Sequence, residues 1–118
     1  MTPKERSTWR YYVNGLRKRL PPGLPVKVKT CAAAEGEHAC LLYPNRHEKF
    51  WLLKIGNHLD FDGRIDSLLH EWTHCLVGER PPTDQSEHHS IWGVYYAKVY
   101  RVYEQLSEEL EQEYANER

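Results

Sequence analysis

The chain has 118 residues, of which 40% are hydrophobic and 28% are charged, and its formal net charge is −1. This length and composition are typical of one soluble globular domain, so we expect a single domain over residues 1–118. No apolar run approaches the roughly 18 residues of a membrane span. The near-neutral charge excludes a protein that binds polyanions with its whole surface.

The N-terminal stretch MTPKERSTWR has no apolar segment of the kind found in secretory signals. We therefore expect a cytoplasmic protein without a membrane partner. The three cysteines, Cys31, Cys40 and Cys75, are scattered and form no CxxC motif. Reduced thiols are expected in that compartment, with a disulfide between Cys31 and Cys40 as the alternative.

The first predicted element is a helix that ends before Pro21. Thr2-Pro3-Lys4-Glu5 has a capping-box pattern with proline at the first helical position. Apolar residues then recur at helical spacing, namely Trp9, Tyr12, Val13, Leu16 and Leu20. The helix is also rich in Lys and Arg, which indicates either a solvated face or a surface that contacts phosphates.

Three strand-like runs follow, at residues 25–33, 39–43 and 50–55. The first run alternates valine with lysine, as expected of a strand with one buried face. The segments EGEH and PNRHEK between the runs are typical of turns. The simplest arrangement is a meander of three antiparallel strands.

Two further helices are predicted after the sheet. In DFDGRIDSLLHEWTHCLVG, Asp62 is placed to cap the start and Gly78 to end the helix. Its apolar stripe consists of Ile65, Leu68, Leu69, Trp72 and Leu76. A long helix then runs from about Glu87 to near the C-terminus and ends in acidic turns. The predicted fold class is therefore α+β, with an N-terminal helix, a three-stranded antiparallel sheet and two later helices.

The first of these two later helices carries the motif H-E-x-x-H as His70, Glu71 and His74. Residues four apart lie one turn apart on the same side of a helix, so both imidazoles can face one metal ion. Catalytic zinc keeps three protein ligands and one water, whose pKa it lowers towards about 7. Glu71 is placed to take the proton of that zinc-bound water as general base. The other interpretation is a polar helix face without a metal.

The third ligand is left open by the motif. His88 and His89 are adjacent, and on a helix they point about 100° apart, so both cannot easily bind one ion. Glu104 or Glu108 on the last helix is a further alternative. Tyr95 or Tyr96 could donate a hydrogen bond to a developing oxyanion, although core packing is the simpler role for each.

A helical HExxH, a short loop, and a histidine followed four residues later by a large aromatic residue resemble the SprT-like zinc metallopeptidases. The stretch EHHSIWG also resembles small phage-type HExxH proteins. The resemblance covers residues 63 to about 103 and implies a zincin-like fold. Because the family's aromatic follows its third ligand by four positions, Trp92 implies His88 as the third ligand. His89 is then the alternative ligand or a substrate contact.

The expected function is a zinc-dependent metallopeptidase that hydrolyses a protein or peptide substrate. Trp72 and Trp92 are expected to pack around the site and support the ligands. The alternative is a non-catalytic, zinc-stabilised binding or assembly module of a phage or mobile element. A third hypothesis is a protease that is activated by a nucleic-acid partner. Many SprT-like proteins carry a cysteine-rich zinc ribbon after the catalytic part, where this chain has an acidic segment.

Overall fold

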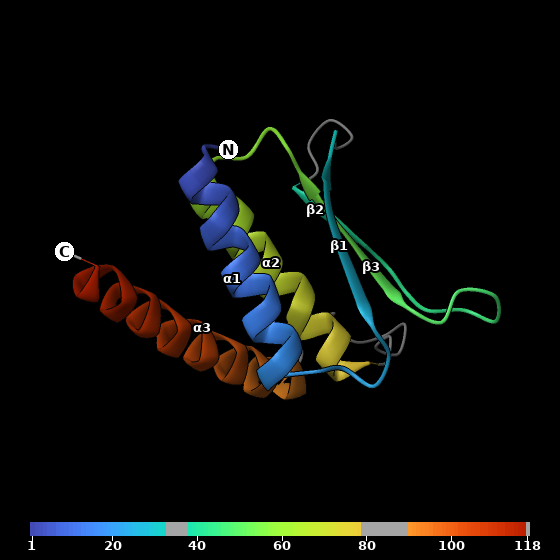
Figure 1. Cartoon of the computed structure of the whole chain (residues 1–118). Helices are drawn as coiled ribbons and strands as arrows, with labels where there is room; N and C mark the ends of the chain where they lie inside the picture. Colours follow the sequence, from blue (N-terminus) through green and yellow to red (C-terminus); the bar gives the residue numbers. More distant parts are fainter. Residues whose placement is uncertain (33–37, 79–89, 118) are drawn as a thin grey trace.

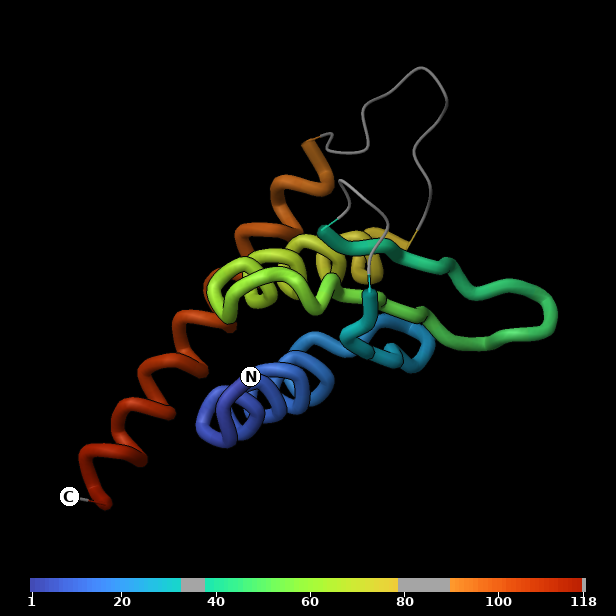
Figure 2. The backbone as a smooth tube through the Cα atoms, turned by 90° about the horizontal axis from the view of Figure 1, so that it is seen from above, coloured from blue at the N-terminus to red at the C-terminus, as the bar shows by residue number. Residues whose placement is uncertain are grey.

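The computed structural model describes residues 1–32, 38–78 and 90–117 (Figure 1). In chain order its elements are α1 (Pro3–Arg19), β1 (Val26–Cys31), β2 (Ala39–Leu42), β3 (Trp51–Gly56), α2 (Phe61–Val77) and α3 (Ser90–Asn116). The helices lie on one side of a three-stranded sheet (Figures 1 and 2). The predicted α+β class is confirmed.

The N-terminal helix forms as its capping pattern predicts. The side chain of Thr2 accepts a hydrogen bond from the Glu5 amide at 3.1 Å, and the Glu5 carboxylate accepts one from the Thr2 amide at 2.9 Å. These two bonds satisfy amides that the first turn of a helix leaves without partners. The buried side of α1 consists of Trp9, Tyr12, Val13 and Leu16.

The sheet differs from the predicted antiparallel meander. Its strand order is β1-β3-β2, with β1 parallel to β3 and β2 antiparallel to β3, so it is mixed. Two chain reversals make β1 and β3 run the same way in either arrangement, but the predicted strand order was wrong, and with it the all-antiparallel pairing. β3 takes the centre because Trp51, Leu53 and Ile55 are all buried. β1 carries Lys27 and Lys29, and charged residues are typical of edge strands.

Helix α2 also corrects one prediction. Its N-cap is Asp60 and not the predicted Asp62. The Asp60 carboxylate accepts a hydrogen bond from the Gly63 amide at 2.8 Å. Asp62 lies inside the first turn, where its negative charge still faces the positive end of the helix dipole. At the other end Gly78 adopts φ 77° and ψ −24°, and its amide donates to the His74 carbonyl. The predicted glycine stop is confirmed, and it fixes the last turn that carries His74.

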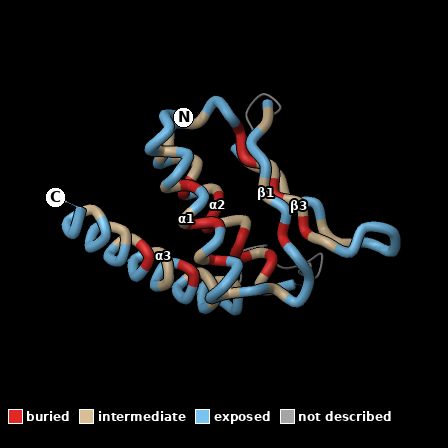
Figure 3. The backbone as a smooth tube through the Cα atoms, viewed as in Figure 1, coloured by how far each residue is buried: buried red, intermediate tan, exposed pale blue. Residues whose placement is uncertain are grey.

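The core lies between the helices and the inner face of the sheet (Figure 3). Helix α2 supplies Ile65, Leu68, Leu69 and Trp72, each at most 4% exposed. The indole nitrogen of Trp72 donates a hydrogen bond to the Leu20 carbonyl at 3.0 Å, just after α1 ends. This bond joins α2 to the end of α1 inside the core.

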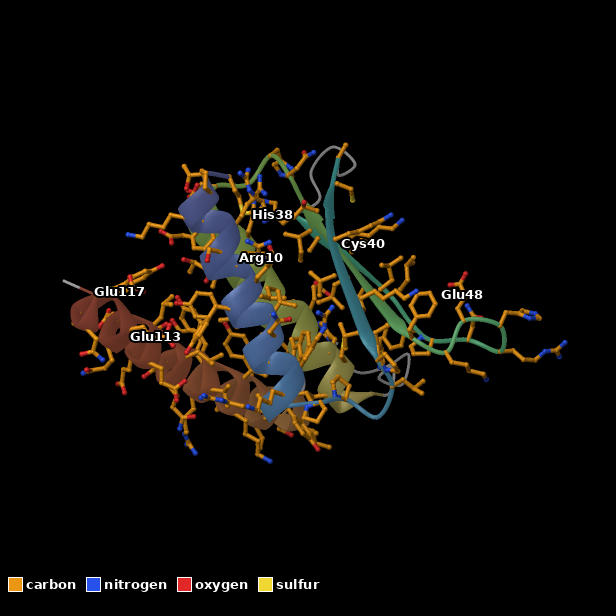
Figure 4. All side chains as sticks on the ribbon, viewed as in Figure 1. Arg10, His38, Cys40, Glu48, Glu113 and Glu117 are labelled. Carbon is orange, nitrogen blue, oxygen red and sulfur yellow. The ribbon has the colours of Figure 1, made fainter. Side chains whose placement is uncertain are left out.

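Helix α3 packs on α1 and α2, and its C-terminal part projects away from the sheet (Figures 1 and 2). Glu113 and Glu117 lie on the projecting part, far from the loop that carries Glu48 (Figure 4). Helix α3 approaches α1 closely at Gly15, which has no side chain. A Cβ atom added there would lie only 2.5 Å from Cδ2 of the buried Leu106. The predicted start at Glu87 lies outside the described residues.

The cysteines agree with the expectation of reduced thiols. Cys31, Cys40 and Cys75 are all free, so the alternative disulfide between Cys31 and Cys40 is not formed. Among the helices that the structure describes, none is both long and apolar enough to cross a membrane.

Replacing Trp72 with phenylalanine is expected to lower the free energy of unfolding by about 1–3 kcal/mol. The change leaves the partly buried Leu20 carbonyl without its donor and opens a small cavity in the core. Urea unfolding followed by circular dichroism measures the loss. Trp9→Phe is the matched control, since it removes an indole from the same core without breaking the bond to Leu20. Equal stability of Trp72→Phe and the wild type would contradict this account of the core.

Candidate metal centre

The HExxH residues lie on the side of α2 that faces away from the main core. Leu68, Leu69 and Trp72 are buried, whereas His70, Glu71 and His74 are half-buried. At about 100° per residue, His70 and His74 lie roughly 160° around the helix from the centre of the buried stripe. Burial of that stripe therefore turns the two imidazoles and the carboxylate away from the core.

These three side chains line one pocket of about 220 Å³. The opposite wall is formed by β2 and the residue that follows it, namely Ala39, Cys40, Leu41 and Tyr43. β2 is an edge strand of the sheet, hydrogen-bonded to β3 on one side. The pocket thus lies between the HExxH residues of α2 and the edge strand β2.

The geometry of the two imidazoles fits a shared zinc ion. Their ring centres are 5.0 Å apart and their planes are inclined by 67°. A zinc ion about 2.0–2.1 Å from each ligating nitrogen and tetrahedral angles would place the ring centres about 5 Å apart. Imidazole nitrogen is a preferred zinc donor, and Glu71 lines the same pocket without sharing the histidines' side of the helix.

Trp92, in the first turn of α3, packs against both histidines. Its ring centre lies 5.1 Å from that of His70 and 5.6 Å from that of His74. The ring of Trp92 also stacks on that of Tyr96, at 4.8 Å between ring centres and with an interplanar angle of 13°. The start of α3 is therefore held directly against the HExxH pair.

The structure separates the candidates for a third ligand. Glu104 lies about 18 Å along the helix from Trp92, at about 1.5 Å per residue, and Glu108 lies farther still. Both are exposed, which places them away from the two histidines. His88 and His89 lie outside the described residues. Within the described ranges, no three side chains among His, Cys, Asp and Glu form a group that could hold a metal ion.

The remaining residues singled out from the sequence occupy other positions. Trp72 is fully buried and bonded to the end of α1, so its support for the histidines passes through the α2 backbone. Tyr96 lies behind Trp92, where burial raises the pKa of its phenol and the nearby Asp66 raises it further. Burial also raises the pKa of the Cys75 thiol, with the Glu71 carboxylate as the second cause.

Several basic side chains of α1 make contacts within the molecule. Arg17 donates to the Val26 carbonyl at 2.9 Å, and Arg19 forms an ion pair with Glu109. The ammonium group of Lys4 lies 5.0 Å from the ring centre of Tyr114. These contacts tie α1 to β1 and to the acidic end of α3, which gives its positive charge a structural role.

Sequence reasoning missed the contribution of β2 and Tyr43 to the pocket. The motif marks the helix wall, but the opposite wall depends on which strand lies at the sheet edge. A central β2, as in the predicted meander, would have hydrogen bonds on both sides. Its position at the edge makes the ACLLY stretch a wall of the site.

Comparison with known proteins adds no relative: no family model, no curated protein and no solved structure matches the chain.

Proposed function

We propose that the chain is a zinc-dependent metallopeptidase in which His70, His74 and His88 hold the metal. The observation that carries the proposal is the shared pocket, which brings two imidazoles at zinc-compatible spacing together with Glu71 and an edge strand. The chemistry of this donor set is that of a catalytic zinc site with an open position.

Trp92 supports His88 as the third ligand. Its ring packs against both His70 and His74, so the start of α3 lies beside the HExxH pair. His88 precedes the first residue of this helix, Ser90, by two positions. The same start would bring His89 near the pair, and the spacing to Trp92 in the SprT-like pattern favours His88.

Glu71 performs the proton transfers in the proposed reaction. Zinc, when bound, polarises the scissile carbonyl and makes water more acidic. Glu71 accepts a proton from the attacking water as the new C–O bond forms at the carbonyl carbon. The carboxylic acid then passes that proton to the amide nitrogen, the C–N bond breaks, and an amine leaves.

The edge strand supplies a binding site for an extended peptide. β2 is paired with β3 on one side, and its residues line the pocket beside Glu71. A substrate segment can add to such an edge through main-chain hydrogen bonds, with its scissile bond held over the pocket. This arrangement favours unfolded or flexible protein segments as substrates.

Glu71→Gln is expected to keep one zinc per chain and to lower kcat by about 10²–10⁴-fold, because the amide cannot accept the proton. Zinc content is measured by mass spectrometry and hydrolysis with a mixed peptide library and unfolded casein. Glu104→Gln is the control, since it makes the same change at an exposed carboxylate about 18 Å along α3 from Trp92. If the wild type binds zinc but cleaves none of these substrates, the non-catalytic module replaces the peptidase.

His88→Ala is expected to lose zinc, whereas His89→Ala is expected to retain it. The proposed site needs three protein imidazoles, and removing one leaves too few for tight binding. Metal content after dialysis and a zinc titration of the apoprotein distinguish the two variants. Zinc loss from His89→Ala alone would make His89 the ligand.

Trp92→Leu is expected to weaken zinc binding by about tenfold, as removal of groups that orient metal ligands commonly does. The leucine loses the ring that packs on both imidazoles. Isothermal titration of the apoprotein with zinc gives the change in affinity. Val94→Ala is the control, because Val94 is 58% exposed on the same helix. Equal affinities of Trp92→Leu and the wild type would show that the packing has no influence on the metal site.

A further inference from the structure

Tyr43 belongs to the proposed active site by position. It follows directly after β2 and lines the same pocket as His70, Glu71 and His74. Its ring packs on Trp51, with ring centres 4.9 Å apart and planes inclined by 57°. Because Trp51 is only 5% exposed and belongs to the core, the phenol is attached to a rigid support.

Strand alternation directs Tyr43 to the helix side of the sheet. Ala39 and Leu41 stand opposite the fully buried Ile55 and Leu53, so these positions of β2 face the core and α2. Tyr43 continues the same alternation and also packs against the core. Cys40 stands opposite Lys54 in the other phase, and it also lines the pocket.

The chemistry of the described pocket wall gives Tyr43 a distinct role. His70 and His74 are assigned to the metal, Glu71 is a proton acceptor, Ala39 and Leu41 are apolar, and the Cys40 thiol is only a weak donor. The phenol of Tyr43 can donate a strong O–H hydrogen bond from the wall opposite Glu71. Hydrolysis of a peptide bond places negative charge on the carbonyl oxygen, and a fixed donor aimed at that charge lowers the barrier.

We propose that Tyr43 is a further catalytic residue, whose phenol donates a hydrogen bond to the scissile carbonyl oxygen as that oxygen becomes negative. The phenol keeps its proton throughout, so the transfers through Glu71 are unchanged. This inference rests on the proposed peptidase function. It adds Tyr43, which follows the edge strand β2, to the three residues His70, Glu71 and His74 of α2.

The test compares zinc-loaded wild type with Tyr43→Phe, which keeps the ring on Trp51 and removes only the hydroxyl. Casein hydrolysis is expected to show kcat lowered by about 10²-fold, as for loss of one oxyanion donor, with KM within about twofold. Zinc content and melting temperature stay at the wild-type values. Tyr100→Phe is the control, because Tyr100 is 41% exposed on α3.

A second readout does not need turnover. A phosphinic peptide with alanine on both sides of the phosphinate carries a tetrahedral anion where the oxyanion would form, and calorimetry gives its affinity for each protein. Tyr43→Phe is expected to bind it at least tenfold more weakly than the wild type, since the anion loses a donor.

The outcomes separate the two proposals. Equal kcat and equal phosphinate affinity in Tyr43→Phe and the wild type would overturn the role of Tyr43 and leave the peptidase in place. If the wild type binds the phosphinic peptide more tightly than Tyr43→Phe does but does not hydrolyse casein, the peptidase proposal is overturned. The hydrogen bond from Tyr43 to the tetrahedral anion is then kept. A wild type that neither binds the phosphinate nor cleaves casein would overturn both.

Discussion

The burial of one face of α2 is the constraint on which the candidate site depends. Leu68, Leu69 and Trp72 are almost completely inaccessible, and Trp72 is hydrogen-bonded to the end of α1. A helix anchored in this way cannot rotate without exposing large apolar side chains, at about 25 cal/mol for each Å² of apolar surface. The side of α2 on which His70, Glu71 and His74 lie is therefore set by the core.

Two other elements complete the pocket around that fixed helix. The first turn of α3 places Trp92 on both imidazoles, and Tyr96 stacks behind it. The edge strand β2 and Tyr43 form the opposite wall. The two HExxH histidines, the Glu71 carboxylate and an edge strand thus meet in one place, which is the combination that the proposed cleavage of an extended peptide requires.

Local patterns predicted the helices well because the forces that form them are local. The capping box at Thr2 and the glycine stop at Gly78 both form as expected. The N-cap of α2 was misplaced by two residues, since Asp60 and Asp62 offer the same chemistry. Strand order was wrong because it depends on competition between distant segments for the buried central place, which β3 wins. The position of Tyr43 in the pocket depends on that order, so no short pattern indicated it.

The central claim is that one zinc ion lies between His70 and His74 in the pocket beside β2. Anomalous diffraction at the zinc absorption edge, from crystals of zinc-loaded protein, tests it most directly. The account predicts one strong peak about 2.0–2.1 Å from a nitrogen of each imidazole and of His88, with the Glu71 carboxylate nearby but not bound to the metal. A fully loaded crystal with its zinc elsewhere, or with His70 and His74 directed away from any metal, would contradict it.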